Sequence, residues 1–481
     1  MKEIITVFPE ILLASLTCLI MVIDVFLPEK KRAATFWLSI LSVLGVLVVV
    51  ATWLPAENLR SFHGNFISDP VAIVMKTALL IVVLMSFFYA KDFFERHEGE
   101  KNTFFILALF STLGMMFLIS ANTLLTVYLG LELLSLSLYA MVAMDRDSPK
   151  ASEAAMKYFV LGAMASGLLL YGMSMLYGVS GTLDLAELST QELSDGNRIL
   201  YAFGLVFILI GIAFKLGVAP FHMWVPDVYE GASTPVALFL SSAPKLAAFV
   251  MALRLLAEGL GGLSGDWQIM LISLAIISMG LGNVIAIAQT NFKRMLAYST
   301  IAHMGFLLLG IATANVMGYS AAMFYVIVYA VMGMGAFGAI ILLSTPENSC
   351  ENLDDLKGLA RRTPWTAFVL LIVIFSLAGV PPFAGFWAKW FVLKEVVAAG
   401  YAWLAALAVF FSLIGAFYYL RVIKLMYFDE GSETLEAVQQ SEEARLIFSL
   451  NGVTILLLGL LPGALMSVCL GAMFAVESLG Y

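Results

Sequence analysis

Four charged side chains lie inside long apolar stretches of this 481-residue chain: Glu132, Lys215, Lys245 and Lys389. A charge at the centre of a lipid bilayer costs about 2.5–3.5 kcal/mol on insertion scales, and residues that bear this cost usually lie on a proton or ion path. Burial removes the hydration that stabilises an ammonium group, so a buried lysine is able to release and reload a proton near neutral pH. The four side chains therefore predict that the chain moves charge across a membrane.

Each of the three lysines stands near a proline. The pairs are Lys215 with Pro220, Lys245 with Pro244, and Lys389 with Pro381 and Pro382. Proline removes a backbone donor and clashes with the preceding helical turn, and the carbonyl groups freed around Pro244 can hold water beside the amine of Lys245. The alternative for each lysine is that its side chain reaches the membrane surface. Their distance from the ends of their apolar stretches makes this difficult, so we interpret all three as proton carriers.

Glu132 stands near the middle of its apolar stretch, ten residues after Asn122. A lone buried carboxyl group stays protonated, whereas a nearby lysine restores its charge. Contact between the carboxylate and a lysine would then control the proton affinity of that lysine, and the two groups would titrate as a unit. The alternative is a permanent pair that only holds two helices together.

Three other residues are weaker candidates for the same path: Lys157, His222 and His303. Lys157 follows Glu153 in the first turns of its stretch. Pairing with Glu132 and extension of the side chain to the membrane surface are equally consistent with this position. A histidine can relay protons near neutral pH, but a lone histidine is as often only hydrogen-bonded. We assign three further basic residues to the membrane interface: Lys76, Arg254 and Lys424.

The composition is that of a membrane protein. Hydrophobic residues make up 61% of the chain and charged residues only 12%, against about 25% charged in ordinary globular domains. The three cysteines are far apart and lack metal-type spacing, which argues against a disulfide scaffold, a zinc site or an iron–sulfur cluster formed by this chain alone. The sequence has no glycine-rich dinucleotide motif and no basic patch for nucleic acid, so we expect neither a cofactor nor a metal on this chain.

Fourteen apolar stretches are long enough to cross about 30 Å of hydrocarbon. They fall near 4–27, 35–54, 70–90, 103–120, 122–144, 154–178, 198–222, 233–257, 268–289, 295–314, 317–344, 364–394, 401–428 and 446–475. The first resembles a signal anchor but lacks a small-residue cleavage site, so we take it as a retained span. We therefore predict an all-α polytopic membrane protein with about 14 transmembrane helices and no sizeable soluble domain.

Basic residues gather in alternate loops, and the positive-inside rule places those loops in the cytoplasm and both chain ends on the outer side. These residues are Lys30, Lys31, Arg32, Lys91, Arg96, Lys101, Arg146, Lys150, Lys293, Arg294, Lys357, Arg361, Arg362 and Arg445. The opposite loops hold little beyond Arg60 and Arg198. Asp227 and Glu230 mark a mouth on the cytoplasmic side.

One internal repeat is visible in the sequence. GVAPFHMW (217–224) is similar to GVPPFAGFW (379–387), which follows 162 residues later. The offset of five spans turns the second copy upside down in the membrane, and inverted repeats with two broken helices are typical of ion-coupled transporters. We divide the chain into 1–102 (three helices), 103–258 (first five-helix repeat), 259–428 (inverted second repeat) and 429–481 (a loop and the last helix). The alternative is two proline kinks that are alike by chance.

Together these motifs resemble one family over essentially the whole length: the N-type, antiporter-like membrane subunits of bacterial respiratory complex I, the proton-pumping NADH:quinone oxidoreductase. The resemblance rests on LELLSLSLY with Glu132, FKLGVAPFHMWVPDVYEGASTPV with Lys215, SSAPKLAAF with Lys245, FKRMLAYSTIAHMGF, LDDLKGL, and GVPPFAGFWAKWFV with Lys389. It implies two inverted five-helix repeats and half-channels that meet on a central polar axis. It also implies that Glu132 modulates Lys215, that Lys245 connects towards the middle, and that Lys389 serves the exit half-channel.

The resemblance implies partners as well. NADH, FMN, iron–sulfur clusters and quinone would be bound by other subunits, and the neighbours would include the antiporter-like subunit M and small membrane-arm subunits. The chain would lie in the lipid bilayer of a bacterial inner membrane. Two alternatives stay open: a subunit of a cation/proton antiporter, and a scaffold of the membrane arm that carries no protons.

Overall fold

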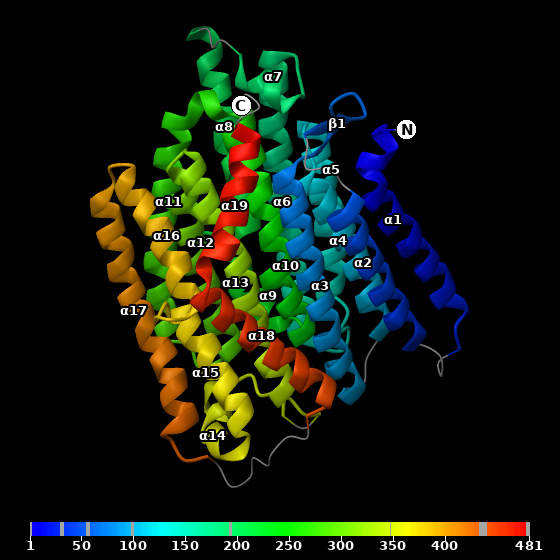
Figure 1. Ribbon diagram of the computed structural model, residues 1–481, viewed down its shortest axis with the longest axis vertical. Helices are drawn as coiled ribbons and strands as arrows, with labels where there is room; N and C mark the ends of the chain where they lie inside the picture. Colours follow the sequence, from blue (N-terminus) through cyan, green and yellow to red (C-terminus); the bar gives the residue numbers. More distant parts are fainter. Residues whose placement is uncertain are drawn as a thin grey trace.

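The computed structural model describes residues 2–28, 33–53, 58–97, 101–191, 195–346, 348–431 and 440–477. Long helices run along the vertical axis of the molecule, with both chain ends at its upper end (Figure 1). In the described part of the chain, 13 helices are long and apolar enough to cross a membrane. The prediction of an all-α polytopic membrane protein is confirmed.

The elements follow one another as α1 (Lys2–Phe26), α2 (Ala33–Trp53), β1 (Leu59–Ser61), β2 (Phe66–Ser68), α3 (Pro70–Arg96), α4 (Lys101–Ile119), α5 (Leu124–Val142), α6 (Pro149–Ser180), α7 (Leu185–Ser189), α8 (Asp195–Leu216), α9 (Trp224–Gly231), α10 (Thr234–Ala252), η2 (Leu253–Gly259), η3 (Gly261–Leu263), α11 (Ser264–Ile287), α12 (Phe292–Ala312), α13 (Val316–Leu343), η4 (Leu353–Leu356), α14 (Leu359–Arg362), α15 (Pro364–Ala378), α16 (Ala384–Ala398), α17 (Ala402–Tyr427), α18 (Glu442–Leu460) and α19 (Pro462–Glu477). The antiparallel β1–β2 hairpin is the one sheet in the described residues, and the sequence analysis did not predict it.

Three helices form the centre of the bundle. Every residue of α10 is buried, and nearly every residue of α12 and α13 is buried as well. Outer helices such as α1 and α17 instead expose large apolar side chains, as expected where a protein faces lipid. Polar groups on α10 and α12 therefore point into protein rather than into hydrocarbon.

The two predicted helix breaks are present. The first separates α8, which ends at Leu216, from α9, and the second separates α15, which ends at Ala378, from α16. Each break starts with a glycine in the left-handed region, Gly217 at φ +77° and Gly379 at φ +87°, a conformation that L side chains rarely adopt. The short helices α15 and α16 together occupy the expected span 364–394, which completes the 14 predicted spans.

A third break was not predicted. The expected span 446–475 is divided at Leu461, and Pro462 begins α19, because proline cannot continue the hydrogen bonding of the preceding turn. The freed carbonyl of Gly459 accepts a hydrogen bond of 2.8 Å from the indole of Trp387 on α16. A Cβ on Gly459 would lie 2.2 Å from the carbonyl oxygen of Pro382. The third break thus packs directly against the second.

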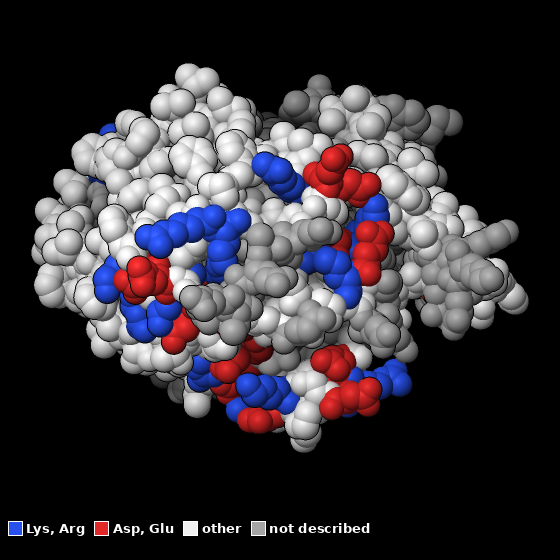
Figure 2. All heavy atoms as spheres, turned by 90° about the horizontal axis from the view of Figure 1, so that it is seen from below, with Lys and Arg blue, Asp and Glu red and all other residues white. Residues whose placement is uncertain are grey.

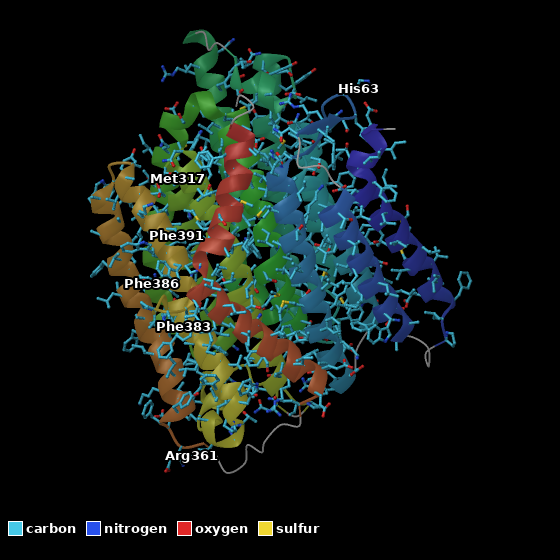
Figure 3. The ribbon with its side chains drawn as sticks, viewed as in Figure 1. His63, Met317, Arg361, Phe383, Phe386 and Phe391 are labelled. Atoms are coloured by element: carbon cyan, nitrogen blue, oxygen red, sulfur yellow. The ribbon has the colours of Figure 1, made fainter. Side chains whose placement is uncertain are left out.

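Charged side chains gather on the lower end of the molecule. Lys and Arg lie there among Asp and Glu (Figure 2), and Arg361 of α14 lies at this end whereas His63 lies at the upper one (Figure 3). Ion pairs on this side include Lys91 with Glu443, at 2.5 Å. The predicted basic residues 30–32 and residues 432–439 of the loop 429–445 lie outside the described residues.

The packing of the third break gives a first prediction. Gly459→Ala places a methyl group against the backbone of the second break, and overpacking of this kind costs about 1–3 kcal/mol. We expect a lower thermal unfolding temperature of the purified protein, measured by intrinsic fluorescence. Gly463→Ala, four residues later in open space, is the matched control and should leave the unfolding temperature unchanged. Equal unfolding temperatures for both variants would contradict this packing.

Candidate functional site

Lys215 lies in the last turn of α8 and is buried. Its amine donates a hydrogen bond of 2.9 Å to the hydroxyl of Ser135 on α5. That hydroxyl in turn donates to the carbonyl of Leu131, at 2.6 Å. The first predicted proton carrier is therefore held by a neutral group.

Glu132 lies three residues before Ser135 on the same helix. Its carboxylate accepts a hydrogen bond from the hydroxyl of Ser166 on α6. In the described part of the chain, Glu132 and Lys215 do not form an ion pair, so the direct contact considered from the sequence is not made here. The carboxylate still acts electrostatically on Lys215, because few water molecules can screen a charge inside a protein.

Lys245, on α10, lies at the first break. Its amine donates to the carbonyl of Leu216 at 2.9 Å and reaches the carbonyl of Lys215 at 3.4 Å. The same amine lies 5.3 Å from the ring centre of Trp224. The last carbonyls of a helix have no partner within it and carry partial negative charge. The break thus provides a ready site for an ammonium group.

Lys389, on α16, lies at the second break in the same way. Its amine donates to the carbonyl of Ala378 at 2.9 Å and to the hydroxyl of Ser412 on α17 at 2.9 Å, and it reaches the carbonyl of Leu377 at 3.3 Å. A lysine thus binds the carbonyl end of the broken helix at both breaks. This shared geometry is the strongest regularity of the site.

His303 begins a buried chain of hydrogen bonds beside Lys389. Its Nδ1 hydrogen-bonds to the hydroxyl of Tyr325 at 2.7 Å, and its Nε2 to the hydroxyl of Tyr419 at 3.1 Å. The hydroxyl of Tyr419 also hydrogen-bonds to Ser299. His303 and Lys389 line one cavity of about 10 Å³, close to the smallest space that holds a water molecule. The weaker sequence candidate therefore lies next to a stronger one.

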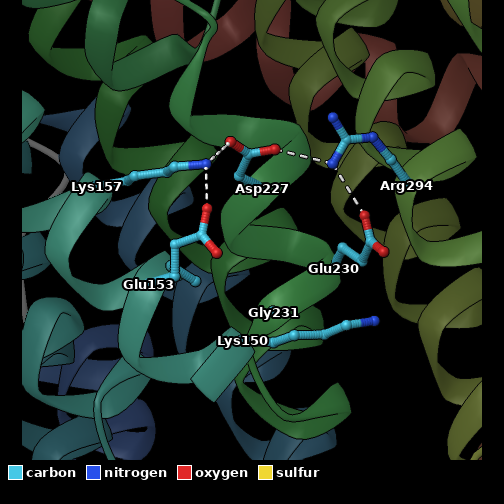
Figure 4. A pocket seen from close by; sticks show the side chains of 8 residues that line it. Lys150, Glu153, Lys157, Asp227, Glu230, Gly231 and Arg294 are labelled. Carbon is cyan, nitrogen blue, oxygen red and sulfur yellow. Dashed lines mark hydrogen bonds and ion pairs between the residues drawn. The ribbon is translucent and has the colours of Figure 1, made fainter. Parts of the chain in front are cut away.

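Lys157 belongs to a separate charged cluster where α6, α9 and α12 meet (Figure 4). Its amine lies 2.7 Å from Glu153 and 2.6 Å from Asp227, and it does not pair with Glu132. Arg294 joins the cluster from α12, at 2.8 Å from Asp227 and 2.9 Å from Glu230.

A pocket of about 160 Å³ opens between these side chains. Burial acts to raise the pKa of Asp227, but hydrogen bonds from Lys157 and Arg294 outweigh it and hold the pKa below its usual value. This pocket suits the opening that the sequence analysis expected at Asp227 and Glu230. His222 lies apart from these groups in the first break, and its Nδ1 has no hydrogen-bond partner among the described residues.

Several site residues were missed or misplaced by sequence reasoning. The hydroxyls of Ser135, Ser166 and Ser412 give no signal, because serine is common in membrane helices. Lys76 and Arg254 were assigned to the membrane interface, but the structure places neither side chain at the protein surface. Both are fully buried in ion pairs, Lys76 with Glu10 at 2.6 Å and Arg254 with Asp69 and Glu258. The carboxylates that hold them come from other helices or lie one turn away, so composition near each residue does not reveal them. No group of three or more His, Cys, Asp or Glu in the described residues could hold a metal ion.

Comparison with known proteins finds relatives over nearly the whole chain. The family model described as NADH:quinone oxidoreductase/Mrp antiporter, TM, matches residues 121–415. NADH-quinone oxidoreductase subunit N of Thiobacillus denitrificans is 52% identical over 466 residues, which cover 96% of both chains. A chain of respiratory complex I from Thermus thermophilus has a TM-score of 0.82 and 33% identity, over 95% of this chain and 98% of that one.

A chain of the Mrp complex from Dietzia shares the fold, with a TM-score of 0.83 over 100% of this chain and 98% of that one, at 21% identity. The sequence matches cover nearly the full length, and the region that the family model matches contains both helix breaks together with Glu132, Lys215, Lys245 and Lys389. The chain belongs to the NADH:quinone oxidoreductase/Mrp antiporter transmembrane family, within the NADH-quinone oxidoreductase subunit N group.

Proposed function

We propose that this chain is a proton-translocating subunit in the membrane arm of NADH-quinone oxidoreductase, where it couples electron transfer from NADH to quinone to the movement of protons across the membrane. The observation that carries the proposal is the matched pair of lysines, Lys245 and Lys389, each on the carbonyl end of a broken membrane helix. The family and the names of the relatives support it.

The contacts of the lysines differ in a way that would suit proton transfer. Lys215 donates to one neutral hydroxyl, whereas Lys245 and Lys389 each reach two backbone carbonyls. Carbonyl groups at a helix end favour a positive charge. Lys215 lacks these carbonyl contacts, so the group that favours its charge is the carboxylate of Glu132. A proton on Lys215 would also repel one on Lys245, because the two charges act on each other.

Glu132 would set the direction of this transfer. Its carboxylate favours a charged Lys215, and its hydrogen bond to Ser166 is a contact that a small movement of α6 against α5 would break. Loss of the carboxylate's influence would release the proton towards Lys245. At the second break, His303 and its tyrosine partners offer a hydrogen-bonded route beside Lys389, since a neutral imidazole accepts a proton on one nitrogen and donates from the other.

The arrangement in the membrane is part of the same proposal. The basic lower end would face the cytoplasm, and both chain ends would lie on the outer side of a bacterial inner membrane. We infer two inverted five-helix repeats, 103–258 and 259–428, because the broken helix comes fourth in each. NADH, FMN, iron–sulfur clusters and quinone would be bound by partner subunits, and the antiporter-like subunit M and small membrane-arm subunits would be neighbours.

A second candidate is a cation/proton antiporter subunit, because the family and the fold are shared with Mrp complexes. Purification in mild detergent separates the two. NADH-oxidising subunits that remain bound to this chain support the first proposal, whereas their absence together with other antiporter chains favours the second.

The role of Lys215 is tested by Lys215→Met, which removes the titratable amine and keeps most of its volume. We expect proton pumping by the assembled complex to fall by about 10²-fold, the lower end of what a positioned acid–base group contributes. Lys394→Met, at an exposed lysine, is the control and should pump normally. Pumping close to normal in an assembled Lys215→Met complex would rule out the assigned role. Lys215→Arg should also be poor, because a guanidinium stays charged at any relevant pH.

The coupling of Glu132 to Lys215 is tested by a double-mutant cycle. Glu132→Gln removes the charge and should slow pumping, whereas Glu132→Asp keeps it and should slow pumping less. Combination of Glu132→Gln with Lys215→Met should be strongly non-additive, because either change disrupts one coupled unit. The same cycle with Glu187→Gln, at an exposed carboxylate on α7, should be additive. Additive losses in both cycles would mean that Glu132 does not act through Lys215.

The orientation is tested with single cysteines in a chain whose exposed Cys18 is replaced by alanine. Arg361→Cys, at the lower end, should react with an impermeant thiol reagent only from the cytoplasm. Thr190→Cys, directly after α7, should react only from the outer side. The reverse pattern would overturn the proposed topology.

A further inference from the structure

A buried cluster of three charges lies outside the proposed proton path. Arg254 is 2.6 Å from Asp69 at the start of α3 and 2.7 Å from Glu258, one turn further along η2. Asp69 also accepts a hydrogen bond of 2.7 Å from the backbone N–H of Ala72. The side chains of Arg254 and Asp69 are wholly buried, and that of Glu258 is 5% exposed. None of these contacts serves the lysines of the two breaks.

The charges of this cluster do not balance. Two carboxylates share one guanidinium, which leaves one excess negative charge in a buried place, and such a charge is costly unless it is neutralised. The other charged group that acts on Glu258 is Arg60 of β1, which is exposed to solvent and therefore screened. Asp69 has two donor groups beside it, the guanidinium of Arg254 and the backbone N–H of Ala72. Glu258 has one.

One oxygen of Glu258 has no hydrogen-bond partner in the described part of the chain, and the residue lines a cavity. Oε2 is buried and has no hydrogen-bond partner among the described residues, whereas Oε1 accepts from Arg254. Glu258 lines a cavity of about 290 Å³, which is large enough for several water molecules. Its other walls come from η2, α11, the start of α13 and the end of α19, and include Trp267, Tyr319 and Met473. These segments meet at the upper end of the molecule, near α7 and the chain ends (Figure 1).

We propose that Glu258 is a proton-binding site on the upper side of the membrane: it holds the proton that balances the charge of the cluster of Asp69, Arg254 and Glu258, and it exchanges that proton with water in the 290 Å³ cavity. The titratable groups around it are Asp69, Arg254, Arg60 and the hydroxyl of Tyr319 on α13, and of the two carboxylates Glu258 is the one that lines the cavity. A role in releasing translocated protons rests on the proposed function, but the binding and exchange of the proton do not.

The site is tested by infrared difference spectroscopy of the assembled complex in vesicles at a series of pH values. We expect the C=O stretching band of a protonated carboxyl group to titrate in the wild type, to be lost in Glu258→Gln, and to shift in Glu258→Asp. Glu187→Gln is the control and should keep the band. Identical spectra of the wild type and both Glu258 variants would overturn the proposal. Glutamine is the neutral isostere of a protonated glutamate, so Glu258→Gln should also assemble normally.

The side of exchange is tested in vesicles whose inner and outer pH are set separately. The band should follow the pH on the side from which Thr190→Cys is labelled, and a band that follows the other side would overturn the proposal. Replacement of sodium by choline should leave the band unchanged, whereas a band suppressed by sodium would mean that a metal cation balances the cluster instead. The band should persist in Lys215→Met, so failure of the lysine path and failure of this site are told apart.

Discussion

Satisfaction of backbone carbonyls inside a bilayer is the constraint on which the rest of this structure depends. A helix that ends within the membrane leaves carbonyl groups without water or intrahelical partners, and each costs several kcal/mol if nothing replaces them. Here the carbonyls at the ends of α8 and α15 are met by Lys245 and Lys389. The same contact stabilises an ammonium group where hydrocarbon would expel it. Break and lysine therefore require each other.

The central helices make these contacts possible. α10, α12 and α13 are surrounded by protein along almost their whole length, so polar groups on them are shielded from lipid. A lysine on α10 reaches the end of α8, a lysine on α16 reaches the end of α15, and the tyrosines beside His303 come from α13 and α17. Ordinary serine and tyrosine hydroxyls link the ionisable groups without adding charge.

The charged groups outside the breaks are also stabilised by polar partners, but these partners are charged side chains rather than backbone carbonyls. At the lower end, Lys157 and Arg294 share the carboxylates of α9 and α6 in a water-accessible pocket. At the upper end, Arg254 holds two carboxylates that are almost wholly buried, one of which lines a cavity. Each cluster has one carboxylate more than its paired cations, but the side chains of the first are partly exposed whereas those of the second are almost wholly buried. That difference separates an ordinary ion-pair network from a candidate proton site.

The sequence by itself determined the membrane class, the spans and the two breaks, because apolar length and proline act locally along the chain. It also identified Glu132, Lys215, Lys245 and Lys389 as residues that need an explanation, since charge in an apolar stretch is costly wherever the helix packs. Only the tertiary structure decided their partners: Ser135 rather than Glu132 for Lys215, and helix-end carbonyls for Lys245 and Lys389. It likewise placed Arg254 inside the protein and revealed the third break against the second. Such contacts join residues far apart in the sequence, as for Arg254 and Asp69, or depend on backbone carbonyls that every residue carries, so no local pattern encodes them.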